Sequence, residues 1–322
     1  MQARWITTIR RRRDIGAIAG TIALFIVFSA VAPDTWLTAF ALGNIFHITA
    51  ILGIMAIGQA MMLISREIDL SVGSVYGVTA ITFLSLEPYL GVFGTFAAAM
   101  LVAAFIGFLN GLLTLKGRIA SFIVTLGGWF FYRGVIYVTT GGTARSLTDE
   151  AREHFLTVLL GGNYLGFENA ILWLVLLTVA LSVTLSGTAF GNQLQAAGGD
   201  AASALARGVR VERVKWASFI ACSCLAGLSG IITVADMPRT HVTLGEDMEL
   251  ESIAAAVIGG CLLTGGRGSI LGAVLGAFIL SAIRYQLIAL GAPPYWFISF
   301  VGIVVIFAVM GNSALAGWLR RT

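Results

Sequence analysis

The chain contains 322 residues, of which 58% are hydrophobic and only 11% are Asp, Glu, Lys or Arg. A soluble globular domain carries about 25% charged residues, and the mean hydropathy of +0.92 also departs from that class. These values argue against a soluble enzyme, a disordered chain and a disulfide-stabilised scaffold, and they indicate an integral membrane protein. Because the net charge of +4 comes from few basic residues, we expect their placement to reflect membrane orientation rather than a nucleic-acid partner.

Apolar segments long enough to cross a membrane recur along the chain, since a hydrocarbon core of about 30 Å needs roughly 20 residues per helix. The first follows Arg10–Arg13 and ends in Ala30–Ala32, like a signal peptide, but Pro33 and the later segments favour a retained helix. The segments are 15–32, 46–64, 70–86, 91–115, 119–140, 169–186, 216–236, 251–263, 268–290 and 295–311. We predict an all-α polytopic bundle of about ten transmembrane helices, forming one transmembrane domain over residues 1–322.

The distribution of basic residues predicts the orientation of these helices. Most of the 20 Lys and Arg residues fall before residue 14 or in connections that alternate on one side of the membrane. Only Arg145, Arg152 and Arg239 fall in connections on the other side, while Arg133 and Arg284 lie within spans. Cytoplasmic loops are enriched in Lys and Arg, so we expect both termini to be cytoplasmic.

Three hydrophilic connections are long enough to do more than join helices. Residues 141–168 and 237–250 are then periplasmic loops rich in acidic side chains, and residues 187–215 form a cytoplasmic segment. The residue pattern of the cytoplasmic segment predicts a loop followed by a short amphipathic helix. A short turn would have been enough to join the two flanking spans, so we expect this segment to have a role of its own.

Small residues recur at four-residue spacing in several spans, which places them on one helix face and allows close helix packing. The predicted packing glycines are Gly73, Gly77, Gly107, Gly111, Gly268, Gly272 and Gly276. The order Gly-Ser-Val-Tyr-Gly at 73–77 loosely echoes Gly-Ser-Ile-Leu-Gly at 268–272. Such an echo is consistent with an internal duplication, which transporters often contain.

Motifs for catalysis and metal binding are absent from the sequence. It has no G-x-x-x-x-G-K-[ST] loop, no H-E-x-x-H spacing and no G-x-S-x-G elbow. The three histidines are isolated, and the three cysteines lie in apolar runs without zinc spacing. We therefore expect no catalytic residue, no metal and no cofactor in this chain, and any ATP that drives it must bind another chain.

A few polar residues within or beside the spans are candidates for a translocation pathway, because burying such groups is costly without a partner or water. Asp69 either caps the helix that follows or lines the path. Arg284, near mid-span, calls for a solute or a carboxylate partner, and a contact with a neighbouring helix is favoured for Asn110. Arg133 is expected to reach the outer interface. The candidate pathway residues are Asp69, Ser71, Asn110, Thr125, Arg284 and Tyr285.

Several ordered motifs resemble those of bacterial sugar ABC importer permeases, the inner-membrane components of binding-protein-dependent systems of the ribose, xylose, arabinose and autoinducer-2 type. Residues 66–74, Arg-Glu-Ile-Asp-Leu-Ser-Val-Gly-Ser, are similar to the family's G-G-I-D-L-S-V-G-S, with Arg66-Glu67 in place of two glycines. Residues 108–113, 119–134 and 249–272 match further blocks in order, although Ala120 replaces a proline. The resemblance covers nearly the whole chain.

The resemblance also implies a role for the cytoplasmic segment. Residues 197–209 are similar to the family's A-x-G-x-N-x-x-A-A-x-x-x-G-I element, which docks on the ATPase, with Asp200 in place of the usual Asn. An apolar and basic short helix of this kind suits a groove on a soluble partner. The predicted ATPase-coupling residues are Gly198, Gly199, Asp200, Ala201, Ala202, Leu205, Arg207 and Gly208.

The resemblance implies a permease subunit that imports a sugar or similar small polar solute into the cytoplasm. Its implied partners are a cytoplasmic ABC ATPase, a periplasmic solute-binding protein, a second permease subunit, identical or different, and the lipid of the inner membrane. The usual Asn-Gly pair of the penultimate span is replaced here by Tyr285-Gln286, so the solute stays open. Nucleosides or branched-chain amino acids are alternative solutes. An ion-coupled secondary carrier and a membrane scaffold remain alternatives of other classes.

Overall fold

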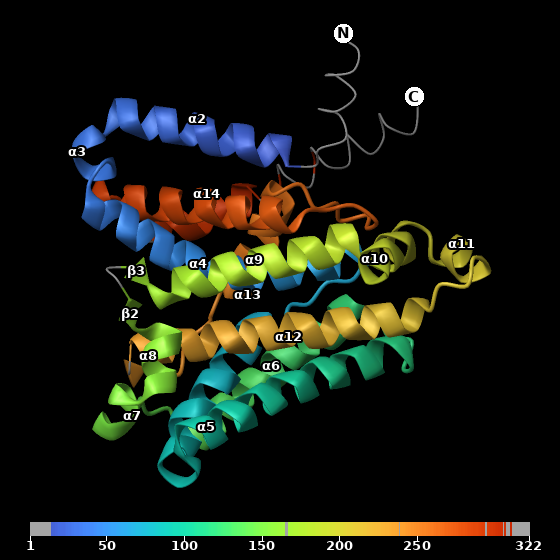
Figure 1. Ribbon diagram of the computed structural model, residues 1–322, viewed down its shortest axis with the longest axis horizontal. Helices are drawn as coiled ribbons and strands as arrows, with labels where there is room; N and C mark the ends of the chain where they lie inside the picture. Colours follow the sequence, from blue (N-terminus) through green and yellow to red (C-terminus); the bar gives the residue numbers. More distant parts are fainter. Residues whose placement is uncertain are drawn as a thin grey trace.

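The computed structural model describes residues 14–164, 167–237, 239–293, 295–304, 306 and 310. Its long helices lie side by side in one bundle, and Figure 1 shows α2, α14, α4, α9, α12 and α5 following one another across it. The helices are α2 Ile15–Val31, α3 Pro33–Trp36, α4 Ala39–Ile64, α5 Val72–Leu115, α6 Ser121–Thr140, α7 Asp149–Glu153, α8 Phe155–Gly161, α9 Asn169–Gly187, α10 Ala189–Gly199, α11 Ala201–Ala206, α12 Val211–Asp236, α13 Met248–Ile258 and α14 Ile270–Ala289. A further apolar helix covers Tyr295–Val304.

The helical membrane fold predicted from composition is confirmed. In the described part of the chain six helices are long and apolar enough to cross a membrane, namely α4, α5, α6, α9, α12 and α14. Their outward faces carry large apolar side chains, such as Phe130 and Phe131 of α6, which are 64% and 67% exposed. Such faces are stable only against lipid or another apolar surface.

Helix α5 is a bent pair of limbs rather than one straight rod. Its 44 residues would extend over about 66 Å, more than twice the thickness of a hydrocarbon core. The chain folds back at Gly91, whose φ of 63° and ψ of 172° belong to a region that only glycine adopts without strain. The two limbs correspond to the predicted segments 70–86 and 91–115.

Two helix boundaries differ from the predicted ones for identifiable reasons. Helix α4 begins at Ala39, ahead of the predicted residue 46, because the hydroxyl of Thr38 accepts a hydrogen bond from the Ala41 amide at 3.0 Å and caps the helix. Helix α13 spans only 11 residues and ends at Ile258, ahead of the predicted residue 263. A glycine-rich turn with positive φ at Gly260, Gly265 and Gly266 follows it.

Close backbone approach explains the spacing of several small residues. Helix α12 packs against both α4 and α5 at the centre of the bundle. At Gly107 a Cβ atom would come within 2.7 Å of the Phe219 carbonyl oxygen of α12. At Gly276 it would come within 2.0 Å of the Ala255 carbonyl oxygen of α13, so any larger residue would push these helices apart.

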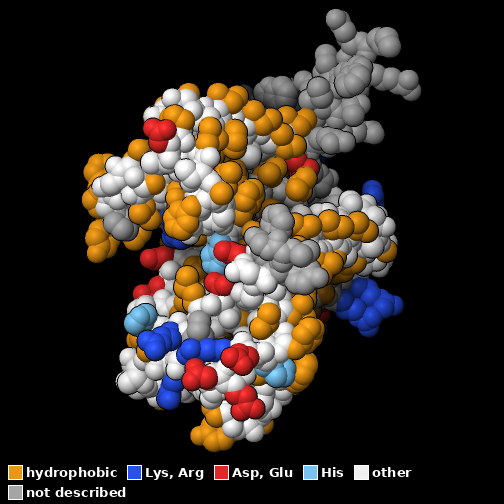
Figure 2. All heavy atoms as spheres, turned by 60° about the vertical axis from the view of Figure 1, so that its left-hand side comes forward, with side chains coloured by type: hydrophobic (Ala, Val, Ile, Leu, Met, Phe, Trp, Pro, Cys, Tyr) orange, Lys and Arg blue, Asp and Glu red, His pale blue; other side chains and the backbone are white. Residues whose placement is uncertain are grey.

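The two ends of the bundle differ in structure. The short helices α10 and α11 extend from one end, and α7, α8 and the strands gather at the other (Figure 1). The strands are minimal additions to the all-α fold: β1 Arg145–Ser146 pairs antiparallel with β4 Arg239–Thr240, and β2 Asn163–Tyr164 pairs antiparallel with β3 Phe167–Glu168. The β1–β4 pair joins the two connections predicted to be periplasmic. Figure 2, turned toward this end, shows charged side chains of both signs gathered on it.

Two non-helical segments, one largely buried and one partly exposed, position the candidate site. Residues 65–71 join α4 to α5, and residues 239–247, which we name the outer strap, lead into α13. They bring the start of α5 against the end of the strap, where a Cβ atom on Gly73 would lie 2.4 Å from the Gly245 carbonyl oxygen. The region predicted as a periplasmic loop, 237–250, therefore packs against α5 along part of its length.

Candidate functional site

The segment 65–71 carries a cluster of buried polar groups centred on Asp69. One carboxylate oxygen of Asp69, Oδ1, accepts hydrogen bonds from the Ser71 amide at 2.8 Å and the Ser71 hydroxyl at 2.6 Å. The Gln59 side-chain amide of α4 donates to the Asp69 carbonyl oxygen at 2.5 Å. Asp69 thus holds Ser71, the residue before α5, in the turn that leads into the helix, and its side chain does not cap the first helical amides.

Helices α5 and α6 complete the cluster. The Asn110 side-chain amide donates to the Ser71 hydroxyl at 2.9 Å, and the Tyr132 hydroxyl donates to Asn110 Oδ1 at 3.1 Å. The Thr125 hydroxyl donates to the carbonyl oxygens of Ser121 at 2.8 Å and Ile68 at 3.3 Å. The structure therefore brings together four of the predicted pathway residues, Asp69, Ser71, Asn110 and Thr125.

All four of these side chains are buried in the interior of this single chain, none more than 1% exposed. Asp69 Oδ2 is also buried, and it has no hydrogen-bond partner within the described residues. A buried polar atom without a partner costs about 1–3 kcal/mol. The cluster thus ties α4, α5 and α6 together while leaving one carboxylate oxygen able to accept a further bond.

Arg284 and Tyr285 lie elsewhere in the fold. Arg284 of α14 forms an ion pair with Glu251 of α13, and its guanidinium lies 4.3 Å from the centre of the Phe297 ring. This is the carboxylate partner that its mid-span position calls for. Tyr285 packs instead beside Trp36 and Ile45, at the contact of α14 with α3 and α4.

The predicted coupling segment, residues 187–215, contains α10 and the protruding helical turn α11, which lie at the opposite end from α7 and α8 (Figure 1). Asp200 caps α11: its Oδ1 accepts from the amides of Ala202 at 3.0 Å and Ser203 at 3.2 Å, and its Oδ2 accepts from the Ser203 hydroxyl at 2.6 Å. These hydrogen bonds from Ser203 hold the pKa of Asp200 below its ordinary value. Ala204 is buried against Ala197 and Val211, whereas Leu205 is 60% exposed.

Exposed and basic residues surround that exposed leucine. Ala202, Arg207, Gly208 and Arg210 are exposed, and Ala201 is half-buried. Gly208 has a φ of 82°, which allows the chain to turn sharply from α11 toward α12. This surface combines an apolar tip with positive charge.

The base of the coupling segment contacts the start of segment 65–71. At Gly198 of α10 a Cβ atom would lie 1.8 Å from the Ile64 carbonyl oxygen, and that oxygen accepts a hydrogen bond from the Gly266 amide at 2.8 Å. On the other side, Lys215 of α12 pairs with Glu67 at 2.5 Å. A displacement of α10 or α12 therefore acts directly on the segment that carries Asp69.

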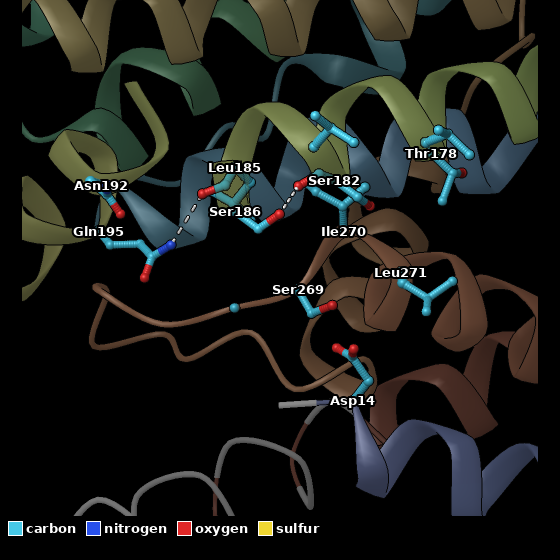
Figure 3. Close-up of a pocket in the computed structure, with 13 residues that line it drawn as sticks. Asp14, Thr178, Ser182, Leu185, Ser186, Asn192, Gln195, Ser269, Ile270 and Leu271 are labelled. Atoms are coloured by element: carbon cyan, nitrogen blue, oxygen red, sulfur yellow. Dashed lines mark hydrogen bonds between the residues drawn. The ribbon is translucent and has the colours of Figure 1, made fainter. Parts of the chain in front are cut away.

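A hollow of about 710 Å³ lies between α9, α10 and the start of α14 (Figure 3). Asp14, Asn192, Gln195 and Ser269 are among the residues that line it. Its Ser186 hydroxyl donates to the Ser182 carbonyl oxygen at 2.7 Å, and Ser269 caps α14. None of the predicted pathway residues lines this hollow, so it is separate from the Asp69 cluster.

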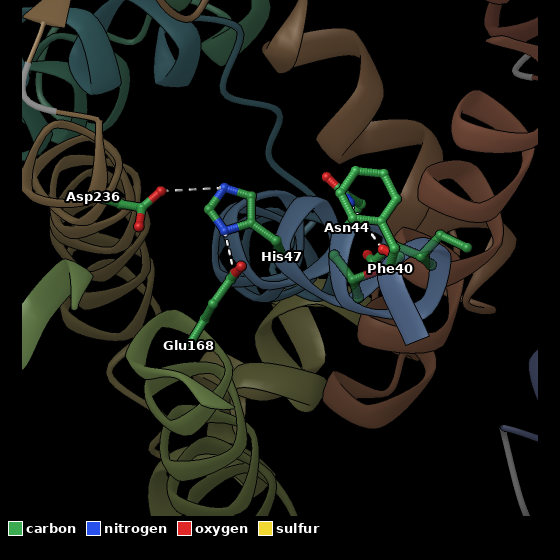
Figure 4. Close-up of polar contacts among 7 residues, drawn as sticks. Phe40, Asn44, His47, Glu168 and Asp236 are labelled. Carbon is green, nitrogen blue, oxygen red and sulfur yellow. Dashed lines mark hydrogen bonds and ion pairs between the residues drawn. The ribbon is translucent and has the colours of Figure 1, made fainter. Parts of the chain in front are cut away.

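His47, which is isolated in the sequence, lies between two carboxylates near the strand-bearing end (Figure 4). Its Nδ1 contacts Glu168 at the start of α9, and its Nε2 is 3.9 Å from Asp236 at the end of α12. This contact joins α4, α9 and α12. Sequence reasoning missed it because the three residues are far apart along the chain and no spacing pattern links them.

Other members of the site were also missed. Gln59 is a lone amide in the apolar segment 46–64, and that isolation was a usable signal, since a polar side chain in a span needs a partner. Tyr132 lies two turns after Thr125 on the same face of α6. The Lys215–Glu67 pair joins residues far apart in the sequence, and no pattern identifies it.

Comparison with known proteins assigns the chain to a family. A family model described as branched-chain amino acid transport system / permease component matches residues 41–309. The chain belongs to this permease family. With its membrane-spanning helices, it is a multi-pass protein of the bacterial inner membrane.

Individual relatives carry a more specific name, autoinducer 2 import system permease protein LsrC. The protein from Klebsiella pneumoniae subsp. pneumoniae is 35% identical over 317 residues, which cover 98% of this chain and 89% of the relative. The protein from Escherichia coli is 31% identical over 316 residues, with coverage of 97% and 90%. That from Yersinia enterocolitica is 32% identical over 317 residues, with coverage of 97% and 86%.

We predict that Asn110→Leu destabilises the fold, because it leaves the hydroxyls of Tyr132 and Ser71 without their amide partner in the interior. The expected loss is about 2 kcal/mol, and thermal unfolding of the purified protein in detergent measures it. Asn44→Leu is the matched control, since the hydrogen bond of the Asn44 side chain within the described residues goes to the Phe40 carbonyl oxygen of its own helix. Equal unfolding midpoints for the two variants would contradict the cluster's role.

Proposed function

We propose that this chain is the membrane-spanning subunit of an ATP-driven, binding-protein-dependent importer for a small sugar-like solute. A separate cytoplasmic ATPase binds the coupling segment, and a periplasmic binding protein delivers the solute to the opposite face. A second permease subunit, identical or different, completes the path. The chain itself makes and breaks no covalent bond.

The geometry of α11 is the observation that carries this proposal. This short, capped helix buries only Ala204, against Ala197 and Val211, and presents an exposed Leu205 flanked by Arg207 and Arg210. An exposed leucine surrounded by basic residues suits a groove on a soluble protein with acidic walls. Its base contacts Ile64 and Gly266, so motion of the partner is transmitted to the helices as a tilt.

The proposed topology has about ten spanning segments and both termini in the cytoplasm. Arg66, Lys116 and Lys215 lie at the α10–α11 end of the bundle: Arg66 packs against Gly265, Lys116 pairs with Glu212, and Lys215 pairs with Glu67. The positive-inside rule favours this end as the cytoplasmic one. The acidic connections 141–168 and 237–250 then face the periplasm, where the binding protein docks.

The names of the relatives favour a polar, hydroxyl-rich solute of the autoinducer-2 kind. Asp69, Ser71, Asn110 and Thr125 are carboxylate, hydroxyl and amide groups of the type that binds hydroxyls. In this proposal they meet the solute after the helices around them separate. Low affinity at this point suits a path, because tight binding would slow release.

Reconstitution tests the proposal. The test uses proteoliposomes that contain this chain, with its ATPase and its binding protein added or withheld. They are offered autoinducer 2, pentoses, hexoses, nucleosides and branched-chain amino acids. We expect uptake of a sugar-like solute only with every component and ATP present. Uptake by the chain alone along an ion gradient would instead identify a secondary carrier, and uptake of an amino acid would reject the solute class.

We predict that Leu205→Asp uncouples the transporter without unfolding it, because this side chain is mostly exposed and its replacement puts a negative charge on the basic docking surface. Uptake in the reconstituted system should fall at least about 10-fold, the effect of losing about 1.4 kcal/mol of binding. The control is Arg118→Gln, an exposed position outside residues 187–215 at which the net charge changes by the same amount. Wild-type uptake by Leu205→Asp would reject α11 as the ATPase contact.

A further inference from the structure

The outer strap, residues 239–247, is held over the start of α5 by one buried arginine. Arg133 of α6 is only 8% exposed, and its Nη1 donates to the carbonyl oxygens of Val242 at 3.1 Å and Leu244 at 2.9 Å. The prediction that Arg133 reaches the outer membrane interface is therefore wrong. Its charge is directed at the backbone of the strap.

Glycines shape the surface on which the strap rests. At Gly77 a Cβ atom would lie 2.8 Å from the Leu244 carbonyl oxygen, and at Gly73 it would lie 2.1 Å from a carboxylate oxygen of Glu249. Gly245 itself has a φ of 85°. The strap therefore packs directly on the backbone of the first turns of α5. We call this contact surface, formed by Gly73 and Gly77, the seat of the strap.

The seat lies directly beside the Asp69 cluster. Gly73 follows Ser71 by two residues, so the strap and Glu249 cover the start of the helix to which Asp69 and Ser71 lead. The opposite edge of the strap is open: His241, Thr243, Glu246 and Asp247 are exposed. A solute that moves from the strand-bearing end toward the cluster meets the strap first.

The hold of Arg133 on the strap is incomplete. A guanidinium has five N–H donors, yet within the described residues its Nε and Nη2 are buried without a hydrogen-bond partner. The nearby Glu249 Oε2 is buried without one as well. A buried charge with few hydrogen bonds raises the free energy of the folded protein. A second conformation in which these donors find acceptors lowers that cost.

We propose that Arg133 is the positioning residue of an outer gate, in which the strap 239–247 blocks access to Asp69 and Ser71 until it leaves its seat on Gly73 and Gly77. This inference rests on the proposed transport function. When the strap lifts, the guanidinium loses its two carbonyl acceptors and its free donors can turn toward the Glu249 carboxylate. The gate is therefore a switch between two sets of acceptors for one charge.

Crosslinking tests whether the strap must move. Tyr137 of α6 donates to Glu246 of the strap at 3.2 Å, and both side chains are exposed. In the protein with Tyr137→Cys and Glu246→Cys, a short bifunctional thiol reagent should abolish solute uptake, and a reducible version of the reagent should allow recovery on reduction. Proteins with only one of the two cysteines control for modification alone.

The matched control joins two residues of one helix, which do not separate. Phe40 and Asn44 lie one turn apart on α4, so Phe40→Cys with Asn44→Cys should be crosslinked without loss of uptake. Full uptake by the crosslinked protein with Tyr137→Cys and Glu246→Cys would overturn the gate. If the wild-type protein takes up no solute in the same assay, the transport proposal fails, and the next measurement still decides the role of Arg133.

That measurement needs only the purified protein. Leu244→Cys places a thiol on the half-buried side of the strap, and Thr243→Cys places one on its exposed side. Arg133→Gln should raise the rate at which a bulky, membrane-impermeant thiol reagent modifies Leu244→Cys by at least about fivefold and leave Thr243→Cys unchanged. Arg133→Lys, which keeps the charge but not the planar fork, should partly restore protection. Equal modification rates for Leu244→Cys with and without Arg133→Gln would overturn the assignment.

Discussion

Every backbone polar group inside an apolar bundle must find a partner, because no water is available to replace one. Helices satisfy this requirement internally, whereas the segment 65–71 and the outer strap satisfy it only in part with backbone–backbone hydrogen bonds. Side chains of neighbouring helices supply the missing bonds instead. Gln59 donates to the Asp69 carbonyl oxygen, Ser121 accepts from the Ile68 amide, and Arg133 donates to two carbonyl oxygens of the strap. The interruptions in the helices are thus specified by particular polar residues.

These interruptions also connect the two ends of the molecule. The coupling segment meets Ile64 through Gly198 and Gly266, and Lys215 holds Glu67. From there the chain runs through Asp69 and Ser71 into the first turns of α5, where Gly73 meets the strap. A non-helical segment held by a few side-chain bonds can change conformation at lower cost than a helix, whose bonds form a cooperative ladder. This continuity gives a physical route by which a movement at the coupling-segment end reaches the outer strap.

Much of this architecture could be predicted from the sequence, and the remainder could not for physical reasons. Apolar length and composition predicted the helical membrane fold, and Asp69, Ser71, Asn110 and Thr125 do lie together. The α13 region was harder, because the run 251–263 is largely apolar and hydropathy does not register that the helix ends at Ile258. The sequence predicts Arg133 at the membrane interface, whereas its acceptors are backbone carbonyl oxygens of the strap. Every residue has such a carbonyl, so no sequence pattern identifies these two as the partners. His47 shows the same limit, since its carboxylate neighbours come from distant helices.

The proposed coupling requires that the segment 65–71 respond to the state of the ATPase. Hydrogen exchange of its backbone amides, measured in the reconstituted complex with and without a non-hydrolysable ATP analogue, tests this most directly. We expect nucleotide binding to change the exchange of the Ile68 and Ser71 amides, which are held by Ser121 and Asp69, while amides in the middle of α12 stay unchanged. Identical exchange in both states throughout 65–71, with nucleotide bound to the ATPase, would contradict it.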